Sequence, residues 1–269
     1  MESVGIIGAG KIGRAIALGL RANNTATELK IICSDHQATT LSELQKEKGI
    51  RCTESNAEVV EASSVIVLCV KPYQAKSVLS ELRNHLKSHH LLISVCASIT
   101  FDQLNEWSGG QARLMRAMPN LPVVVNHGVS VLCSGSRSTS ADSKRALKIF
   151  STVGHVLELE EKHLDSVTAL SGSGPAFMFF FIEALSEAGA RLGIPKEKAY
   201  ELVFHTMRGS AELCLEKTMD PGELIQQVAT PGGCTLEGLK VFDQMNVRKI
   251  LIQTIEATAK RASQLRLEA

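Results

Sequence analysis

The stretch that decides the fold lies near the start of the chain and reads Val4-Gly5-Ile6-Ile7-Gly8-Ala9-Gly10-Lys11-Ile12-Gly13. Its first four residues predict a buried strand, and the G-x-G-x-x-G pattern at Gly8, Gly10 and Gly13 predicts a tight turn into a helix. The second glycine leaves room for a pyrophosphate, and the helix start presents unpaired N–H groups to it. The stretch therefore predicts a dinucleotide-binding unit rather than a mere tight turn.

Runs of strand length alternate with helical stretches over residues 4–159. The predicted strands are Val4–Ile7, Leu29–Cys33, Val65–Val70, Leu91–Val95, Leu114–Met118, Val129–Cys133 and Val156–Leu159. The predicted helices between them are Ile12–Arg21, Thr39–Lys48, Tyr73–Leu86 and Ala141–Val153. Several strands are apolar on both faces, which is typical of parallel strands covered by helices on each side. The alternation favours an α/β fold with a doubly wound sheet.

The second half is expected to be all-helical, because strand signals stop near Lys162. The predicted helices are His163–Leu170, Pro175–Leu192, Lys196–Leu215, Pro221–Val228, Leu236–Met245 and Val247–Gln264. A chain of 269 residues is long enough for two domains of about 150 residues. We predict a nucleotide-binding domain over residues 1–162 and an all-α domain over residues 163–269.

The helix after Pro175 is apolar nearly all round, from Ala176 to Ile182. A helix without a polar face must be surrounded in a water-soluble protein. Burial between two copies of the chain is easier than enclosure by one helical domain, so we predict a homodimer built on this domain. The alternative is a monomer with this helix at the centre of the domain.

Composition argues against nucleic acid as a partner. The chain has 29 Lys plus Arg against 28 Asp plus Glu, a net charge of +1, and aromatic residues make up 4%. Proteins that bind nucleic acid usually show a basic excess and rings on which bases stack. We expect a small-molecule partner instead.

Cysteine usage and hydropathy predict a cytoplasmic protein. The seven cysteines are odd in number and contain no C-x-x-C pair, which is typical of unpaired thiols in a reducing compartment. The first residues lack the basic head and apolar run of a signal peptide. The most apolar stretch, Phe177–Ile182, is stopped by Glu183, short of the roughly 20 residues that a membrane span requires. No membrane association is expected, and an organelle stays open as the alternative to the cytoplasm.

The segment after the second predicted strand bears on the choice of cofactor. Asp35 lies 22 residues after Gly13, where an acidic residue hydrogen-bonds the ribose 2′-hydroxyl of NAD and repels the 2′-phosphate of NADP. Ser34 beside His36 could instead receive that phosphate, and Asp35 could be only a turn residue. The cofactor preference stays open.

Lys71 follows the strand Val65–Val70, at the end of the sheet where such folds place their ligand. Pro72 suits the first turn of the next helix, which leaves Lys71 near either the nicotinamide or the phosphates. The alternative is a solvated lysine at a helix start.

Two segments of the helical half place small residues just before a helix, Leu170–Pro175 and Ala229–Thr235. Exposed amides at such a start bind carboxylates. Either segment alone could be only a helix cap, but two of them favour an anionic small substrate. The adjacent pair His89-His90 would point its rings apart, so no metal site is expected.

Together the segments resemble the pyrroline-5-carboxylate reductase family. The matching segments run in family order and are Val4–Gly10, Val70–Pro72, Arg116–Asn120, Leu170–Ala176 and Pro231–Gly233 followed by Thr235. The resemblance covers nearly the whole chain, and its last two segments are specific to this family. It implies a Rossmann domain that binds NADPH or NADH and a helical domain that dimerises, often into a larger ring. The implied reaction reduces the C=N bond of Δ1-pyrroline-5-carboxylate to give L-proline.

By position in these segments, the resemblance also implies site residues. The implied cofactor contacts are Gly8, Ala9, Gly10, Lys11, Ile12, Ser34, Asn56, Cys69, Val70, Lys71, Pro72, Val95, Cys96 and Ala97. The implied substrate contacts are Thr230, Gly233, Cys234 and Thr235. Thr235 is the implied catalytic residue, with its hydroxyl directed at the ring nitrogen.

Four positions depart from the usual family pattern. Leu121 stands where threonine is common, Phe177 where tyrosine is common, and Thr230 and Cys234 where serine and alanine are frequent. These changes leave the fine choice of substrate open. Two other functions stay open beside the implied one: an NAD(P)H-dependent reductase of another small imine or keto acid, and a non-catalytic NADP-binding sensor.

Overall fold

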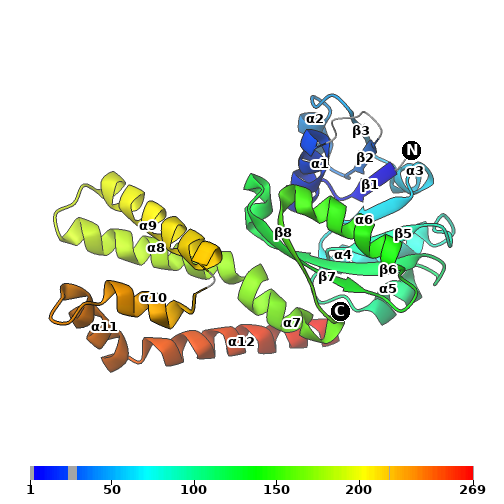
Figure 1. Ribbon diagram of the computed structural model, residues 1–269. Helices are drawn as coiled ribbons and strands as arrows, with labels where there is room; N and C mark the ends of the chain where they lie inside the picture. The colour runs from blue at the N-terminus through cyan, green and yellow to red at the C-terminus, as the bar shows by residue number, and fades with distance from the viewer. Residues whose placement is uncertain (1–2, 24–28, 218, 269) are drawn as a thin grey trace. The chain divides into compact units, whose positions relative to one another are not determined.

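The computed structural model describes residues 3–23, 29–217 and 219–268, and it forms two compact units. The first unit runs to Ser173 and includes the C-terminal stretch from Thr258, while the second comprises Gly174–Ala257. Figure 1 shows a sheet with helices in the first unit and helices in the second. Ser171, just before the division after Ser173, accepts hydrogen bonds from Asn120 of the first unit. The domain boundary at residue 162 stays a prediction.

In the described part of the chain, one eight-stranded sheet runs through the first unit in the order β3-β2-β1-β4-β5-β6-β7-β8. The strands are β1 (Ser3–Ile7), β2 (Lys30–Ser34), β3 (Ile50–Thr53), β4 (Val65–Leu68), β5 (Leu91–Ser94), β6 (Arg113–Pro119), β7 (Gly128–Ser134) and β8 (Gly154–Glu158). Neighbours from β3 to β6 pair in parallel, whereas β6 and β7 are antiparallel. The strand order reverses between β1 and β4, which is where open α/β sheets bind ligands.

Helices cover both faces of this sheet (Figure 1). They are α1 (Lys11–Asn23), α2 (Ala38–Leu44), α3 (Asn56–Glu61), α4 (Pro72–Leu82), α5 (Phe101–Trp107) and α6 (Ser140–Phe150). One apolar core packs α1 and α6 against the sheet through Ile16, Leu20 and Phe150. A second core packs α4 and α5 against it through Leu79 and Leu104. The doubly wound sheet is confirmed.

Short elements connect the sheet to the helical half. They are η3 (Glu161–His163), α7 (Leu164–Val167) and a π-helix, η4 (Thr168–Gly172), whereas η1 (Leu121–Val125) joins β6 to β7 and η2 (Ser151–Val153) joins α6 to β8. The predicted helix His163–Leu170 is therefore three short segments with different hydrogen-bond patterns. The glycines after it do not form a long loop, because α8 begins at Gly174.

The second unit is helical in its described residues. Its helices are α8 (Gly174–Arg191), α9 (Lys196–Lys217), α10 (Pro221–Val228) and α11 (Cys234–Gln244), together with the first half of α12 (Val247–Glu268). Within one chain, Phe179 and Phe180 of α8 are 54% and 66% exposed. A single chain therefore does not enclose the apolar helix, as the homodimer prediction requires.

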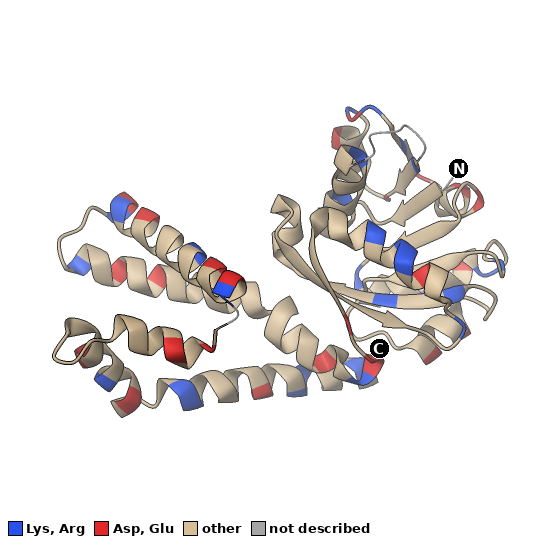
Figure 2. Cartoon of the chain, in the orientation of Figure 1, with Lys and Arg blue, Asp and Glu red and all other residues tan. Residues whose placement is uncertain are grey.

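Both units carry basic and acidic residues (Figure 2). This distribution agrees with the near-neutral net charge of +1. All seven cysteines are unpaired; Cys33, Cys96 and Cys133 are buried, and Cys234 is exposed.

Candidate functional site

The glycine-rich turn between β1 and α1 is shaped by close backbone contacts. Gly8 has a φ of +96°, and a Cβ atom there would lie 2.8 Å from the Cys69 carbonyl. A Cβ atom at Gly13 would lie 2.0 Å from the Gly8 carbonyl oxygen. Around Gly10, by contrast, no described atom lies within 4 Å of where a Cβ would be. The turn therefore needs its first and third glycines for packing and keeps an open cradle at the second.

A crevice of about 680 Å³ opens beside this cradle, at the carboxyl ends of β1, β2 and β4. It is lined by Ile7, Gly8, Gly10, Lys11, Ile12, Asp35, His36, Gln37, Thr40, Glu54, Asn56, Cys69, Val70, Lys71, Gln74, Val78, Val95 and Leu121. The first turn of α1 presents N–H groups without intrahelical partners at its edge. The residues fit a dinucleotide, since the pyrophosphate would occupy the space that a side chain at position 10 would fill.

The structure brings most of the predicted cofactor contacts together. Gly8, Gly10, Lys11, Ile12, Asn56, Cys69, Val70, Lys71 and Val95 line the crevice. Ala9, Ser34, Pro72, Cys96 and Ala97 are their chain neighbours or supports and lie outside this lining. Ser34 is fully buried, and its hydroxyl donates to Asn56 Oδ1 at 2.7 Å. Ser34 therefore holds Asn56 rather than facing the crevice.

Asp35 bridges the turn after β2 to the glycine-rich turn. Its Oδ2 accepts the Ala9 N–H at 2.8 Å, and its Oδ1 accepts the Gln37 N–H at 2.9 Å. His36 Nδ1 lies 3.3 Å from the same Oδ1. The carboxylate is thus a structural element of the turn and also part of the crevice wall.

Lys71 begins helix α4 on the other side of the crevice. Its backbone N–H donates to Gln74 Oε1 at 3.1 Å, and Pro72 occupies the first helical turn. The Lys71 side chain is exposed and lines the crevice, so its charge faces the ligand space.

Burial keeps the thiols of Cys69 and Cys96, near the crevice, in their neutral form. Burial raises the pKa of Cys69 well above its usual range, with added repulsion from Cys96 and Cys33. Burial also raises the pKa of Cys96 to about 11, despite its hydrogen bond with Ser94 and the charge of Arg116. These groups therefore pack as thiols and offer no thiolate nucleophile.

The predicted substrate residues lie in the turn between α10 and α11. The Gly233 N–H donates to the Thr230 carbonyl at 2.9 Å, and Gly233 is the N-cap of α11. Cys234 and Thr235 are the first two residues of that helix; Cys234 is exposed and Thr235 half-buried. The turn therefore presents the start of an eleven-residue helix, where amides bind anions.

Hydrogen bonds of Asn120 and Arg116 in the first unit were not predicted from the sequence. Asn120 Oδ1 accepts the Val129 N–H at 2.8 Å, and its Nδ2 donates to the Ser171 carbonyl at 3.3 Å. Arg116 Nη1 donates to Glu161 Oε1 at 2.7 Å. Arg116 and Asn120 belong to a segment that carries the family resemblance. Their partners Glu161 and Ser171, however, lie 45 and 51 residues further along the chain, and residue spacing does not predict such contacts. Gln37, Thr40, Glu54 and Gln74 also line the crevice and were not predicted; Glu54 was missed because it follows β3, a strand that was itself not predicted.

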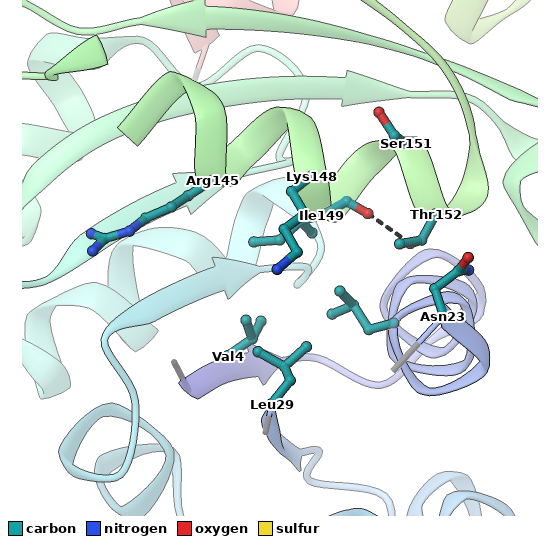
Figure 3. Close-up of a pocket in the computed structure, with 9 residues that line it drawn as sticks. Val4, Asn23, Leu29, Arg145, Lys148, Ile149, Ser151 and Thr152 are labelled. Carbon is teal, nitrogen blue, oxygen red and sulfur yellow. Dashed lines mark hydrogen bonds between the residues drawn. The ribbon is translucent and has the colours of Figure 1, made fainter. Parts of the chain in front are cut away.

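A second cavity of about 300 Å³ lies near the start of β1, away from the carboxyl ends of the strands. Figure 3 shows Arg145, Lys148 and Ile149 of α6 beside Val4 and Asn23. Parallel sheets place ligands at the opposite end of their strands. Among the described residues, no group of three or more His, Cys, Asp or Glu side chains could hold a metal ion.

The fold and the crevice together define a dinucleotide-binding protein of the Rossmann type with an added helical unit. A family model described as pyrroline-5-carboxylate reductase dimerisation matches residues 161–265, and one described as coenzyme F420-dependent NADP oxidoreductase matches residues 3–98. A pyrroline-5-carboxylate reductase of Arabidopsis thaliana is 36% identical over 97% of this chain and 95% of the relative. One of Methanosarcina acetivorans is 35% identical over 98% of both chains.

Solved structures agree with this assignment. A pyrroline-5-carboxylate reductase from Coxiella burnetii has a TM-score of 0.91 at 33% identity, covering 97% of both chains. A Plasmodium falciparum pyrroline carboxylate reductase with NADP bound has a TM-score of 0.87 at 30% identity, covering 98% of both chains. The chain belongs to the pyrroline-5-carboxylate reductase family.

Proposed function

We propose that this chain reduces the C=N bond of L-1-pyrroline-5-carboxylate to give L-proline, the last step of proline biosynthesis. It is an NAD(P)H-dependent oxidoreductase. The observation that carries this function is the family membership over nearly the whole chain, together with a crevice whose open glycine cradle fits a dinucleotide.

NAD(P)H supplies the hydride that the imine carbon accepts. We assign its binding to the predicted contacts, with Gly10 and the start of α1 at the pyrophosphate and Lys71 at the other side of the crevice. Gly8 and Val95 also line this crevice and are assigned to the cofactor. Asn56 is held in place by Ser34.

The substrate carboxylate is assigned to the amides of Gly233, Cys234 and Thr235 at the start of α11, with Thr230 closing the turn. Thr235 is the assigned catalytic residue, since its hydroxyl would hydrogen-bond the ring nitrogen. The nitrogen takes its proton from water, so no strongly perturbed acid is needed. The protein contributes mainly by holding the reactants in register, an effect that can supply several kcal/mol.

The chain acts as a homodimer, and we propose that dimers assemble further into a larger ring. Support for more than one contact surface comes from exposed apolar side chains on α10 to α12 as well as on α8. Examples are Val228, Phe242 and Ile252, which are 67%, 53% and 53% exposed in one chain. Light scattering would give the assembly as a multiple of the 29.0 kDa chain mass.

We propose a cytoplasmic location, supported by seven unpaired cysteines. One helical run, Glu161–Arg191, is long and apolar enough to cross a membrane by length and composition alone, and 11% of its apolar window is buried in one chain. The dimerisation match of the family includes these residues. We therefore propose that a second copy of the chain, rather than lipid, covers the apolar surface of this helical run.

The direct test is NAD(P)H oxidation by the purified protein with pyrroline-5-carboxylate, with L-proline identified as the product. Piperideine-carboxylate and open-chain keto acids serve as competing substrates. Faster turnover of one of these would favour a reductase of another imine or keto acid. Cofactor binding without any turnover would favour a non-catalytic sensor.

A further inference from the structure

Asp35 stands at the ribose end of the crevice. It directly follows β2, and in folds of this kind the residue at the end of the second strand faces the adenosine ribose. Its side chain is 10% exposed, and the residue belongs to the crevice lining. Any ligand lying along the carboxyl ends of β1 and β2 therefore meets this carboxylate.

The carboxylate cannot swing away without breaking the turn around it. Each of its oxygens accepts one backbone N–H, from Ala9 at 2.8 Å and from Gln37 at 2.9 Å. A carboxylate has about four acceptor positions, so acceptor capacity remains for a hydroxyl donor beside these two N–H bonds and the contact with His36. A ribose with both hydroxyls free supplies such donors, whereas a 2′-phosphate brings a second anion to a fixed one.

The surroundings of Asp35 do not offset this charge. Glu54, which follows β3, adds a second acidic residue to the same part of the lining. Arg14 is paired with Glu43, and the Ser34 hydroxyl is buried against Asn56. In the described lining, the Lys and Arg side chains are Lys11, at the start of α1, and Lys71, beyond β4.

We infer that Asp35 makes this crevice select the unphosphorylated ribose of NADH over the 2′-phosphate of NADPH. The inference rests on the proposed function and adds to it the preferred form of the cofactor. Asp35 acts in two ways, since it accepts the ribose hydroxyls and repels the phosphate. His36 also lines the crevice, with its Nδ1 3.3 Å from Asp35 Oδ1, so a 2′-phosphate near this imidazole would still meet the Asp35 carboxylate.

Calorimetric titration with NAD⁺ and NADP⁺ tests the inference without turnover. For the wild-type protein we expect a Kd for NADP⁺ at least about tenfold above that for NAD⁺, since like charges in contact are strongly unfavourable. Asp35→Asn removes the charge and keeps an oxygen for the Ala9 N–H. In this variant the ratio of the two Kd values should fall by about tenfold or more.

Glu61→Gln is the matched control, because it removes one negative charge on α3 outside the crevice lining. It should leave the Kd ratio unchanged.

Raising the salt concentration should lower the wild-type ratio of the Kd for NADP⁺ to the Kd for NAD⁺, because salt screens the repulsion, and this measurement needs no variant. Equal or tighter binding of NADP⁺ by the wild type would overturn the inference, as would a salt-independent ratio or an unchanged ratio in folded Asp35→Asn. Proline formation with either reduced cofactor would leave the proposed function standing in each case.

Discussion

At the residue scale, Gly10 and Gly13 sit three residues apart in one turn but face different surroundings. A methyl group at Gly13 would lie 2.0 Å from the Gly8 carbonyl oxygen, so Gly13→Ala should destabilise the fold by about 1–3 kcal/mol through overpacking. A methyl group at Gly10 meets no described atom within 4 Å, so Gly10→Ala should fold as well as the wild type. It should nevertheless bind NAD⁺ more weakly, because the methyl group enters the pyrophosphate cradle. Urea unfolding and calorimetry measure the two effects, and equal destabilisation by both substitutions would contradict this interpretation.

Thr235 provides a second test at the residue scale. Thr235→Ala should lower kcat/KM. The expected loss of transition-state stabilisation is about 1–3 kcal/mol, the contribution of one buried hydrogen bond. Thr235→Ser keeps the hydroxyl at the start of α11 and should restore most of the rate. Steady-state kinetics with pyrroline-5-carboxylate measures both, and an unchanged kcat/KM in Thr235→Ala would remove the residue from the mechanism.

At the scale of elements, Glu161 of η3 ties together three parts of the first unit. Its Oε1 accepts from Arg116 Nη1 on β6 at 2.7 Å and from the Phe101 N–H at the start of α5 at 2.8 Å. The Arg116 side chain is 6% exposed, and its Nε has no hydrogen-bond partner in the described structure. Removing the carboxylate would leave a buried guanidinium without its counter-charge.

Glu161→Ala should therefore lower the free energy of unfolding by about 3 kcal/mol. Glu160→Ala is the control, because Glu160 forms an exposed pair with Lys162 and its loss should leave the unfolding midpoint in place. The measurement is urea unfolding followed by circular dichroism. Equal midpoints for the two variants would show that Arg116 does not depend on Glu161.

His90, in the turn before β5, makes stability depend on pH. Burial lowers its pKa from 6.5 to about 4, with further repulsion from His89, Arg113 and Lys87, and its Nδ1 accepts the Lys87 N–H at 2.9 Å. Below pH 6.5 the unfolded chain takes up a proton that the folded chain refuses until about pH 4. Stability should therefore fall as the pH drops through this window. His90→Gln should flatten that part of the curve of urea midpoint against pH, and an unchanged slope would contradict the assignment.

Sequence patterns predicted the elements that are long and apolar. They failed for short elements and for pairings that depend on tertiary contacts. The strand Val65–Val70 was recognisable because both faces are buried, and β4 occupies Val65–Leu68. β3 (Ile-Arg-Cys-Thr) was missed because only Ile50 is buried in a short edge strand, and α3 was missed because it has six residues. The antiparallel pairing of β7 with β6 also leaves no mark in residue spacing.

The candidate site shows the same division. The glycine turn was predictable because backbone sterics dictate its residue types, and the place of Asp35 followed from its distance to Gly13. The double hydrogen bonding of Asp35 was not predictable, because it depends on how the turn after β2 meets the glycine turn. The catalytic assignment of Thr235 came from family resemblance and stays a prediction.

At the scale of the whole molecule, we expect the apolar surface of α8 to form part of the dimer interface. Phe180 is 66% exposed in one chain, beside Phe179 and Met178, which are 54% and 47% exposed. Phe180→Glu places a charge where we expect the second copy to pack, and burying an unpaired charge is strongly unfavourable. The variant should elute as a monomer or lower assembly and lose most of its reductase activity.

Leu147→Glu is the control, since Leu147 is a 41% exposed apolar residue on α6, outside the dimerisation match. It should keep the wild-type mass in light scattering, whereas a dimeric, active Phe180→Glu variant would exclude this side chain from the interface.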